Sequence, residues 1–221
     1  MKLWSILRNL IANSLSQAKL GEKLAVESDR KTSDQAFEDG ARQLARYLVR
    51  GGYSARNQIV ESVRDYAEDQ KYRKFDAEKI VASEIAALKV DEAAWPDFTD
   101  YDRLLEAIVR LEGNGVVMRQ DFTCCQTCGH AEIGEEIRNF ETTGRQARGY
   151  AFFHQQATES VVDGGDINFA YGAVGGQATA LEIAKNVADA MRSAGLKVDW
   201  NGKTSMCVMV ELDWKRRWAG G

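Results

Sequence analysis

The sequence predicts an α+β protein, in which a helical amino-terminal half packs on a mixed or antiparallel sheet with one long helix in the carboxyl-terminal half. Two observations support this. Residues 1–112 repeat apolar side chains at helical spacing, whereas β-branched, aromatic and alternating stretches appear from residue 113 onward. A chain of 221 residues can also bury a sizeable core without disulfides or metals. We therefore expect a helical region over 1–112 and an α+β domain over 113–221.

Four amphipathic helices are expected in the amino-terminal region. They cover residues 33–49, 54–70, 76–88 and 99–115. Each repeats apolar residues on one face, the pattern of a helix that packs one side on a core. The fourth follows the chain's only proline, Pro96, and begins at a capping residue, Thr99 or Asp100. Its expected inward residues are Leu104, Leu105, Ile108 and Leu111.

Strands and one long helix are expected in the carboxyl-terminal half. The strands cover residues 116–122, 149–154 and 167–173. The long helix covers residues 177–195, and its expected inward residues are Leu181, Ala184, Val187, Ala188 and Met191. Strands before and after a packed helix are typical of α+β domains.

A hairpin is the strongest local signal near the carboxyl terminus. Asn201-Gly202 suits a two-residue type I′ turn, because both residue types tolerate positive φ. The strand after this turn alternates, with Met206, Val208, Val210, Leu212 and Trp214 on one face. We expect Val198 and Trp200 to pair with the strand around Cys207.

The first twenty residues need to be tested as a signal peptide. Arg8 and Asn9 interrupt their apolar stretch, and no small-residue cleavage site follows it. Leucine and isoleucine instead recur at helical spacing over residues 3–15, which predicts an amphipathic helix. No window approaches the roughly 18 apolar residues of a transmembrane helix. We therefore expect a cytoplasmic protein with no membrane partner, in which cysteines are reduced thiols.

Charge argues against nucleic acid as a partner. The formal net charge is −4, and both halves of the chain share the excess of carboxylates. A nucleic-acid-binding protein presents a basic stripe or patch instead. The one basic run, WKRRW at residues 214–218, is too short for such a patch, and we interpret it as the solvated end of a strand.

Residues 121–130 read DFTCCQTCGH and contain three of the chain's four cysteines. Cys125 and Cys128 have the Cys-x-x-Cys spacing with which two thiolates reach one zinc ion, and the glycine that follows permits a tight turn. Two more ligands are needed for a tetrahedral site, and the other nitrogen or sulfur donors are Cys124, His130, His154 and Cys207; no second Cys-x-x-Cys occurs. Zinc is one interpretation. Small half-buried thiols packed at a strand-to-helix junction are another.

Redox chemistry is the third interpretation of this cluster. A strand, a Cys-x-x-Cys motif and a helix are expected in that order, as in thiol oxidoreductases. A thiol at the amino terminus of a helix is acidified by the helix dipole and by free amides, which gives a reactive thiolate. Thioredoxin-type sites place a proline beside the disulfide, and Pro96 lies far upstream, so an ordinary thioredoxin is not expected.

His154 ends the expected strand 149–154. It could ligate a metal, act as a base toward Cys125 or Cys128, or cap the next helix. If strands 116–122 and 149–154 are parallel neighbours, their carboxyl ends meet at one edge of the sheet. The histidine and the cysteines would then lie close together.

The stretches RQDFTCCQTCGHAEI, GYAFFHQQ, YGA and LDWKRR together resemble a family of bacterial proteins of unknown function. The resemblance covers about residues 99–217. It implies a bacterial intracellular protein and supplies no catalytic residues.

The sequence therefore supports two functional hypotheses. A protein-binding or regulatory module, for example an immunity-type protein, is favoured because no complete catalytic constellation stands out; its partner would be another protein. The alternative is a thiol- or zinc-dependent enzyme or a redox switch centred on Cys125, Cys128 and His154, with zinc as the candidate cofactor.

Overall fold

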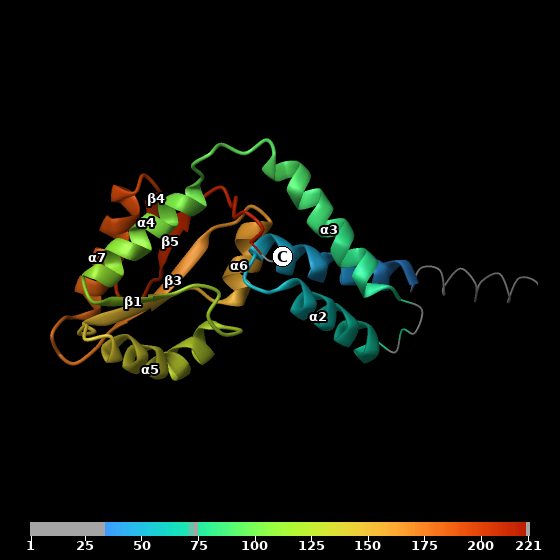
Figure 1. The fold of residues 1–221 in the computed structure, drawn as a ribbon. Helices are drawn as coiled ribbons and strands as arrows, with labels where there is room; N and C mark the ends of the chain where they lie inside the picture. The colour runs from blue at the N-terminus through green and yellow to red at the C-terminus, as the bar shows by residue number, and fades with distance from the viewer. Residues whose placement is uncertain (1–33, 71, 73–74, 220–221) are drawn as a thin grey trace, which may run out of the picture.

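The computed structural model describes residues 34–70, 72 and 75–219 (Figure 1). The amphipathic helix expected at residues 3–15 lies outside them. Within them, helices precede a five-stranded mixed sheet, so the α+β class is confirmed. None of the described helices has the length and apolar character needed to cross a membrane.

Three helices form the amino-terminal layer. The first covers residues 34–51, and it is followed by α2 (Arg56–Asp69) and α3 (Ala77–Glu92), close to the predicted bounds. Their shared core contains Phe37, Ala41, Ala45, Val49, Ile59, Val63, Val81 and Leu88. Asp76 caps α3 by accepting the backbone N–H of Lys79. The apolar faces thus assemble as the helical periodicity predicted.

Helix α4 (Asp100–Gly113) packs with the carboxyl-terminal half. Thr99 caps it as predicted, and the side chain of Asp102 bonds back to the Thr99 backbone. Leu104 and other residues of α4 belong to the same core as the sheet and α7. Leu105 is 37% exposed, so its predicted inward position is wrong; Ala107 is buried instead. The division at residue 112 stays a prediction, and the apolar cores group α4 with the second half.

The sheet contains all five strands in the order β1-β2-β3-β5-β4. They are β1 (Val116–Arg119), β2 (Gly149–Phe152), β3 (Ile167–Ala173), β4 (Lys197–Asp199) and β5 (Val208–Glu211). Strands β1 and β2 are parallel, and every other neighbouring pair is antiparallel. The sheet is therefore mixed, as the sequence predicted.

Helices cover the two faces of the sheet differently (Figure 1). Helices α4 and α7 (Ala180–Ser193) pack on one face of the sheet, and their apolar residues form one large core with residues of the strands. Helix α5 (Gln126–Thr142) covers β1 and β2 on the other face. Alternation along β1 explains this, because Met118 faces the large core and Val117 faces Phe140 of α5. Leu181 of α7 is 47% exposed, so its predicted inward position is also wrong.

The β4–β5 hairpin forms, but its predicted two-residue turn is wrong. Asp199 pairs with Met209, so residues 200–207 form a longer loop. Side chains hold this loop closed: the hydroxyl of Tyr171 donates to the carbonyl of Met206 at 2.8 Å. Met206, predicted on the apolar face, is 54% exposed. Gly202 does adopt the positive φ expected of it, at 79°.

The carboxyl-terminal tail, residues 212–219, joins the two layers. Trp214 donates from its indole N–H to the Arg50 carbonyl at 2.8 Å. The guanidinium carbon of Arg216 lies 3.8 Å from the ring centroid of Tyr53. The interpretation of WKRRW as a solvated strand end is therefore wrong, because the segment follows the end of β5 and four of its five side chains are half-buried; Arg217 alone is exposed.

Candidate functional site

The carboxyl ends of β1 and β2 form the edge at which the candidate residues gather. Because the strands are parallel neighbours, the segments that leave them run side by side. Phe122 donates its backbone N–H to the Phe153 carbonyl at 2.9 Å, and Gln155 donates to the Thr123 carbonyl at 3.1 Å. In sheets with parallel strands, the crevice at the carboxyl ends is a preferred place for ligands and catalysis. The condition under which the two candidate segments were expected to meet is therefore fulfilled.

A sharp bend leads from β1 to the cysteines. Asp121 and Thr123 both have positive φ, at 52° and 59°, which is rare for residues other than glycine. The hydroxyl of Thr158 donates to the Asp121 carboxylate at 2.6 Å, and the hydroxyl of Thr123 donates to the Cys125 carbonyl at 3.1 Å. Burial raises the pKa of Asp121. These bonds hold the unusual backbone and fix where the cysteines lie.

Arg119 holds α5 against the sheet beside this bend. Its guanidinium pairs with Glu136 of α5 at 2.5 Å and with Glu112 of α4 at 3.2 Å. One arginine at the end of β1 therefore links the helices on both sides of the strand.

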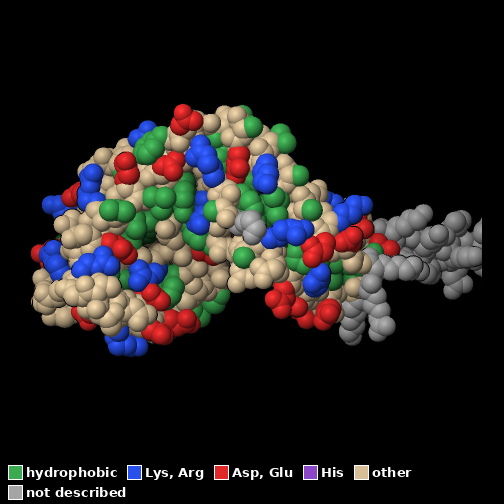
Figure 2. All heavy atoms as spheres, viewed as in Figure 1, with side chains coloured by type: hydrophobic (Ala, Val, Ile, Leu, Met, Phe, Trp, Pro, Cys, Tyr) green, Lys and Arg blue, Asp and Glu red, His purple; other side chains and the backbone are tan. Residues whose placement is uncertain are grey.

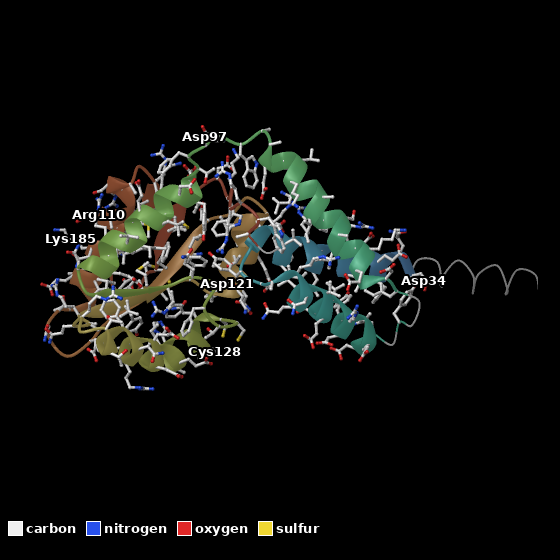
Figure 3. All side chains as sticks on the ribbon, viewed as in Figure 1. Asp34, Asp97, Arg110, Asp121, Cys128 and Lys185 are labelled. Atoms are coloured by element: carbon white, nitrogen blue, oxygen red, sulfur yellow. The ribbon has the colours of Figure 1, made fainter. Side chains whose placement is uncertain are left out.

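The sulfurs of Cys124, Cys125 and Cys128 form a cluster in which all lie within 4.8 Å of one another. The Cys124 and Cys128 sulfurs are 3.5 Å apart. Cys124 is exposed, and the other two are half-buried. Figure 3 shows Cys128 at the end of α5 nearest this bend, on the side away from α4 and α7. The cluster is thus compact and open to solvent.

The three thiols are electrostatically unequal. Cys125 is the N-cap of α5, with an extended backbone. Its side chain forms no capping hydrogen bond, but the nearby backbone N–H of Cys128, the Cys128 thiol and the backbone N–H of Thr127 all lower its pKa. Hydrogen bonds to the Cys124 and Cys125 sulfurs raise the pKa of Cys128 to about 11. Negative charge is therefore favoured on Cys125 and a retained proton on Cys128.

Gly129 has a different role from the one its motif suggested. It lies inside α5 and donates its backbone N–H to the Cys125 carbonyl at 3.0 Å, so the tight zinc-knuckle turn is wrong. A Cβ at this position would lie 2.3 Å from the Phe152 ring. Glycine therefore lets the first turn of α5 approach β2 closely.

The two candidate histidines do not join the sulfur cluster. His130 lies 3.0 Å from the Tyr150 hydroxyl through Nδ1 and edge-on to Phe152. His154 is the N-cap of α6 (Gln155–Val162). Its Nδ1 is buried with no protein partner among the described residues, and burial lowers its pKa. Of the five predicted site residues, the structure brings the three cysteines together as possible joint ligands.

Cys207 is a possible donor by residue type, and the structure shows where it lies relative to the cluster. Its sulfur lies 3.8 Å from the side-chain oxygen of Gln126, the first residue of α5, and burial raises its pKa. All four cysteines therefore gather around the amino terminus of α5. No spacing signal could have revealed this, since Cys207 comes from the loop before β5.

The three clustered sulfurs are possible ligands of a metal ion. Three thiolates fit a soft ion such as zinc, for which metal–sulfur distances are about 2.3 Å. A closed structural site needs a fourth ligand, and no His, Cys, Asp or Glu of the described residues completes the group. Cys124, Cys125 and Cys128 could therefore hold an ion with one open coordination position.

Fold and cluster define an α+β protein with a three-thiol site at the amino terminus of a helix. The chain belongs to the family described as Domain of unknown function (DUF6891), whose model matches residues 34–218. The match includes the cysteine cluster, both histidines and most of the carboxyl-terminal tail. No curated protein and no solved structure matches the chain.

Proposed function

We propose that the protein carries out dithiol–disulfide exchange, with Cys125 as the nucleophile and Cys128 as the resolving thiol. The observation that carries this proposal is the position of the Cys125 sulfur at the N-cap of α5, with the Cys128 sulfur within 4.8 Å. Residues three apart in a helix are neighbours on its surface, so Cys125 and Cys128 suit a disulfide.

The exchange consumes a disulfide and oxidises the protein. The Cys125 thiolate attacks one sulfur of the substrate disulfide, whose S–S bond breaks as one thiolate leaves. The Cys128 thiol then loses its proton and attacks the Cys125 sulfur, which forms the Cys125–Cys128 bond and releases the second thiolate. Two electrons pass to the substrate, which leaves as two thiols.

The unequal thiols support this division of roles. The attacking thiol needs an accessible thiolate, and the lowered pKa of Cys125 favours one. The resolving thiol has to keep its proton until the mixed disulfide has formed, and the pKa of Cys128 is raised to about 11. Cys124 contributes hydrogen bonding to both and has no step of its own.

Metal binding is the second candidate, because three sulfurs lie within reach of one ion. Metal analysis and melting with a strong chelator separate the two functions. Zinc would give metal in the purified protein and a melting temperature that falls with chelator, since metal-binding energy would then be folding energy. The protein-binding role inferred from composition stays a prediction.

The test of exchange uses the full chain, reduced and then treated with hydroxyethyl disulfide. We expect mass spectrometry of digested protein to show a Cys125–Cys128 disulfide. Cys128→Ser should instead accumulate a mixed disulfide on Cys125. Cys125→Ser should form neither product.

Cys124→Ser is the matched control, because it removes a thiol of the same cluster. It should keep both the reaction and the disulfide. A disulfide that forms only between Cys124 and Cys128 would transfer the nucleophilic role to Cys124, and a wild-type chain that stays reduced would overturn the proposal.

A further inference from the structure

The outward face of α5 carries carboxylates directly beside the cysteines. Glu132 lies four residues and Glu135 seven residues after Cys128, with Ala131 three residues after it, so these side chains share one face of the helix. Ala131, Glu132 and Glu135 are exposed. A rise of about 1.5 Å per residue places the two glutamates within roughly 6 to 11 Å of Cys128 along the axis.

These two carboxylates are not neutralised locally. Glu136 is paired with Arg119 at 2.5 Å, but neither Glu132 nor Glu135 forms an ion pair within the described part of the chain. No lysine or arginine occurs in the sequence from residue 120 to residue 137. Arg138, the next positive side chain, lies three residues after Glu135 but forms no ion pair with it among the described residues, and it lies more than two turns beyond Cys128.

A second group of carboxylates lies on α2. Its exposed acidic residues are Glu61, Asp65, Glu68 and Asp69, and none forms an ion pair within the described residues. Figure 2 shows Asp and Glu side chains in red over α5 and over α2 on the same side of the molecule. Carboxylates outside ion pairs attract cations and repel anions over a Debye length of about 8 Å at physiological salt.

We propose that the cysteine site selects positively charged disulfides: its substrate is a cystine in a peptide or protein segment that carries lysine or arginine beside the sulfur. This inference rests on the proposed exchange and names its substrate class. The cysteines perform the reaction, and the carboxylates of Glu132 and Glu135 favour the approach of positively charged disulfides. Anionic small disulfides, such as oxidised glutathione, are repelled before they reach Cys125.

The test compares three small disulfides that differ in charge. Reduced protein is mixed with cystamine, which is cationic, with hydroxyethyl disulfide, which is neutral, and with dithiodiglycolate, which is anionic. Each rate is divided by the rate of the same disulfide with free mercaptoethanol, which removes its intrinsic reactivity. At low ionic strength we expect cystamine to react about tenfold faster than dithiodiglycolate on this scale, and the ratio to approach one in molar salt.

Variants identify the residues that cause the preference for cationic disulfides. The double change Glu132→Gln and Glu135→Gln should reduce the cystamine-to-dithiodiglycolate ratio several-fold while the neutral disulfide keeps its rate. The change Glu38→Gln with Glu106→Gln is the matched control, because it removes the same charge from exposed positions on two other helices. It should leave the ratio unchanged.

Failure of this inference differs from failure of the exchange itself. Equal normalised rates for the three disulfides, or a ratio that survives in the Glu132 and Glu135 variant, would overturn the charge selection alone. Absence of reaction with all three disulfides would overturn the proposed function. A peptide disulfide flanked by lysines should also oxidise Cys125 faster than one flanked by glutamates, and the opposite order would contradict the proposal.

Discussion

Cys125 and His154 occupy equivalent places in two neighbouring segments of the fold. Each is the N-cap of a helix, α5 or α6, that begins where one of the two parallel strands ends. Backbone and thiol donors lower the pKa of Cys125 and so favour its charged form. Burial lowers the pKa of His154 and so favours its neutral form. The same topology therefore favours the thiolate at one helix start and the neutral ring at the other.

The comparison separates two determinants of chemistry. Sheet topology decides which segments meet at an edge, and here it brings both candidates to the same edge. Hydrogen bonding and burial then decide which of them can react. Position at the edge of a sheet is thus insufficient evidence for a catalytic role, and the two caps can be tested separately.

The largest expected effect concerns Cys125. Alkylation by iodoacetamide at pH 6.5 should show one fast thiol, because a lowered pKa leaves more thiolate at a given pH than an ordinary thiol has. Cys125→Ser should slow this phase by about tenfold or more. The rate is measured by mass spectrometry of the alkylated peptides. If the fast phase is lost in Cys124→Ser instead, the reactive thiolate is Cys124, and the comparison of Cys125 with His154 is wrong.

The second prediction concerns how α5 is seated beside β2. Gly129→Ala would place a methyl group 2.3 Å from the Phe152 ring, so we expect a loss of about 2 kcal/mol in the free energy of unfolding. Gly134→Ala in the same helix is the control. Its nearest contact is the Arg138 side chain at 3.6 Å, and helix propensity should make it stabilising by up to about 1 kcal/mol. Equal effects of the two changes in urea denaturation would contradict this packing.

The third prediction concerns the hydrogen bond between Thr158 and Asp121, which connects the start of α6 with the bend before α5. Thr158 of α6 is 5% exposed and donates to Asp121 of the bend before Cys124. Thr158→Val keeps the shape and leaves the carboxylate without this donor, which should cost about 1 to 2 kcal/mol. Thr142→Val, at the exposed end of α5, is the control and should cost less. The fast alkylation of Cys125 should also slow in Thr158→Val, since the bend is less firmly held; an unchanged rate would show that the bond stabilises without positioning.

Much of this edge was predictable from the sequence. The change from helical to strand periodicity near residue 113 predicted the α+β class, and the order strand, Cys-x-x-Cys, helix predicted a thiol at a helix start. The parallel pairing of β1 and β2 was the condition on which the expected meeting of cysteines and histidine depended, and the structure meets that condition. These features depend on local patterns, which a single sequence carries.

The rest depends on contacts between distant segments. Gly129 reads as a turn glycine until the Phe152 ring is known to lie against it. Cys207 reaches α5 only because a loop folds over Gln126. The hairpin turn was wrong because Tyr171 stabilises a longer loop, which the Asn-Gly pair does not reveal. A local sequence pattern does not reveal which distant side chain will contact a given residue in the folded protein.

The smallest expected effect concerns His154. Because its folded-state pKa lies below the ordinary value of about 6.5, the unfolded chain binds the proton more readily than the folded protein does. The free energy of unfolding should therefore fall as the pH decreases from about 6.5 toward the folded-state pKa. The side chain is half-buried, so solvent screens part of the effect and we expect a loss of less than about 1 kcal/mol. His154→Gln, which cannot titrate, should show a smaller decrease in melting temperature between pH 7.5 and pH 5.5 than the wild type. If both proteins lose the same amount, the ring is not kept neutral by the fold, and the contrast between the two helix caps would rest on Cys125 alone.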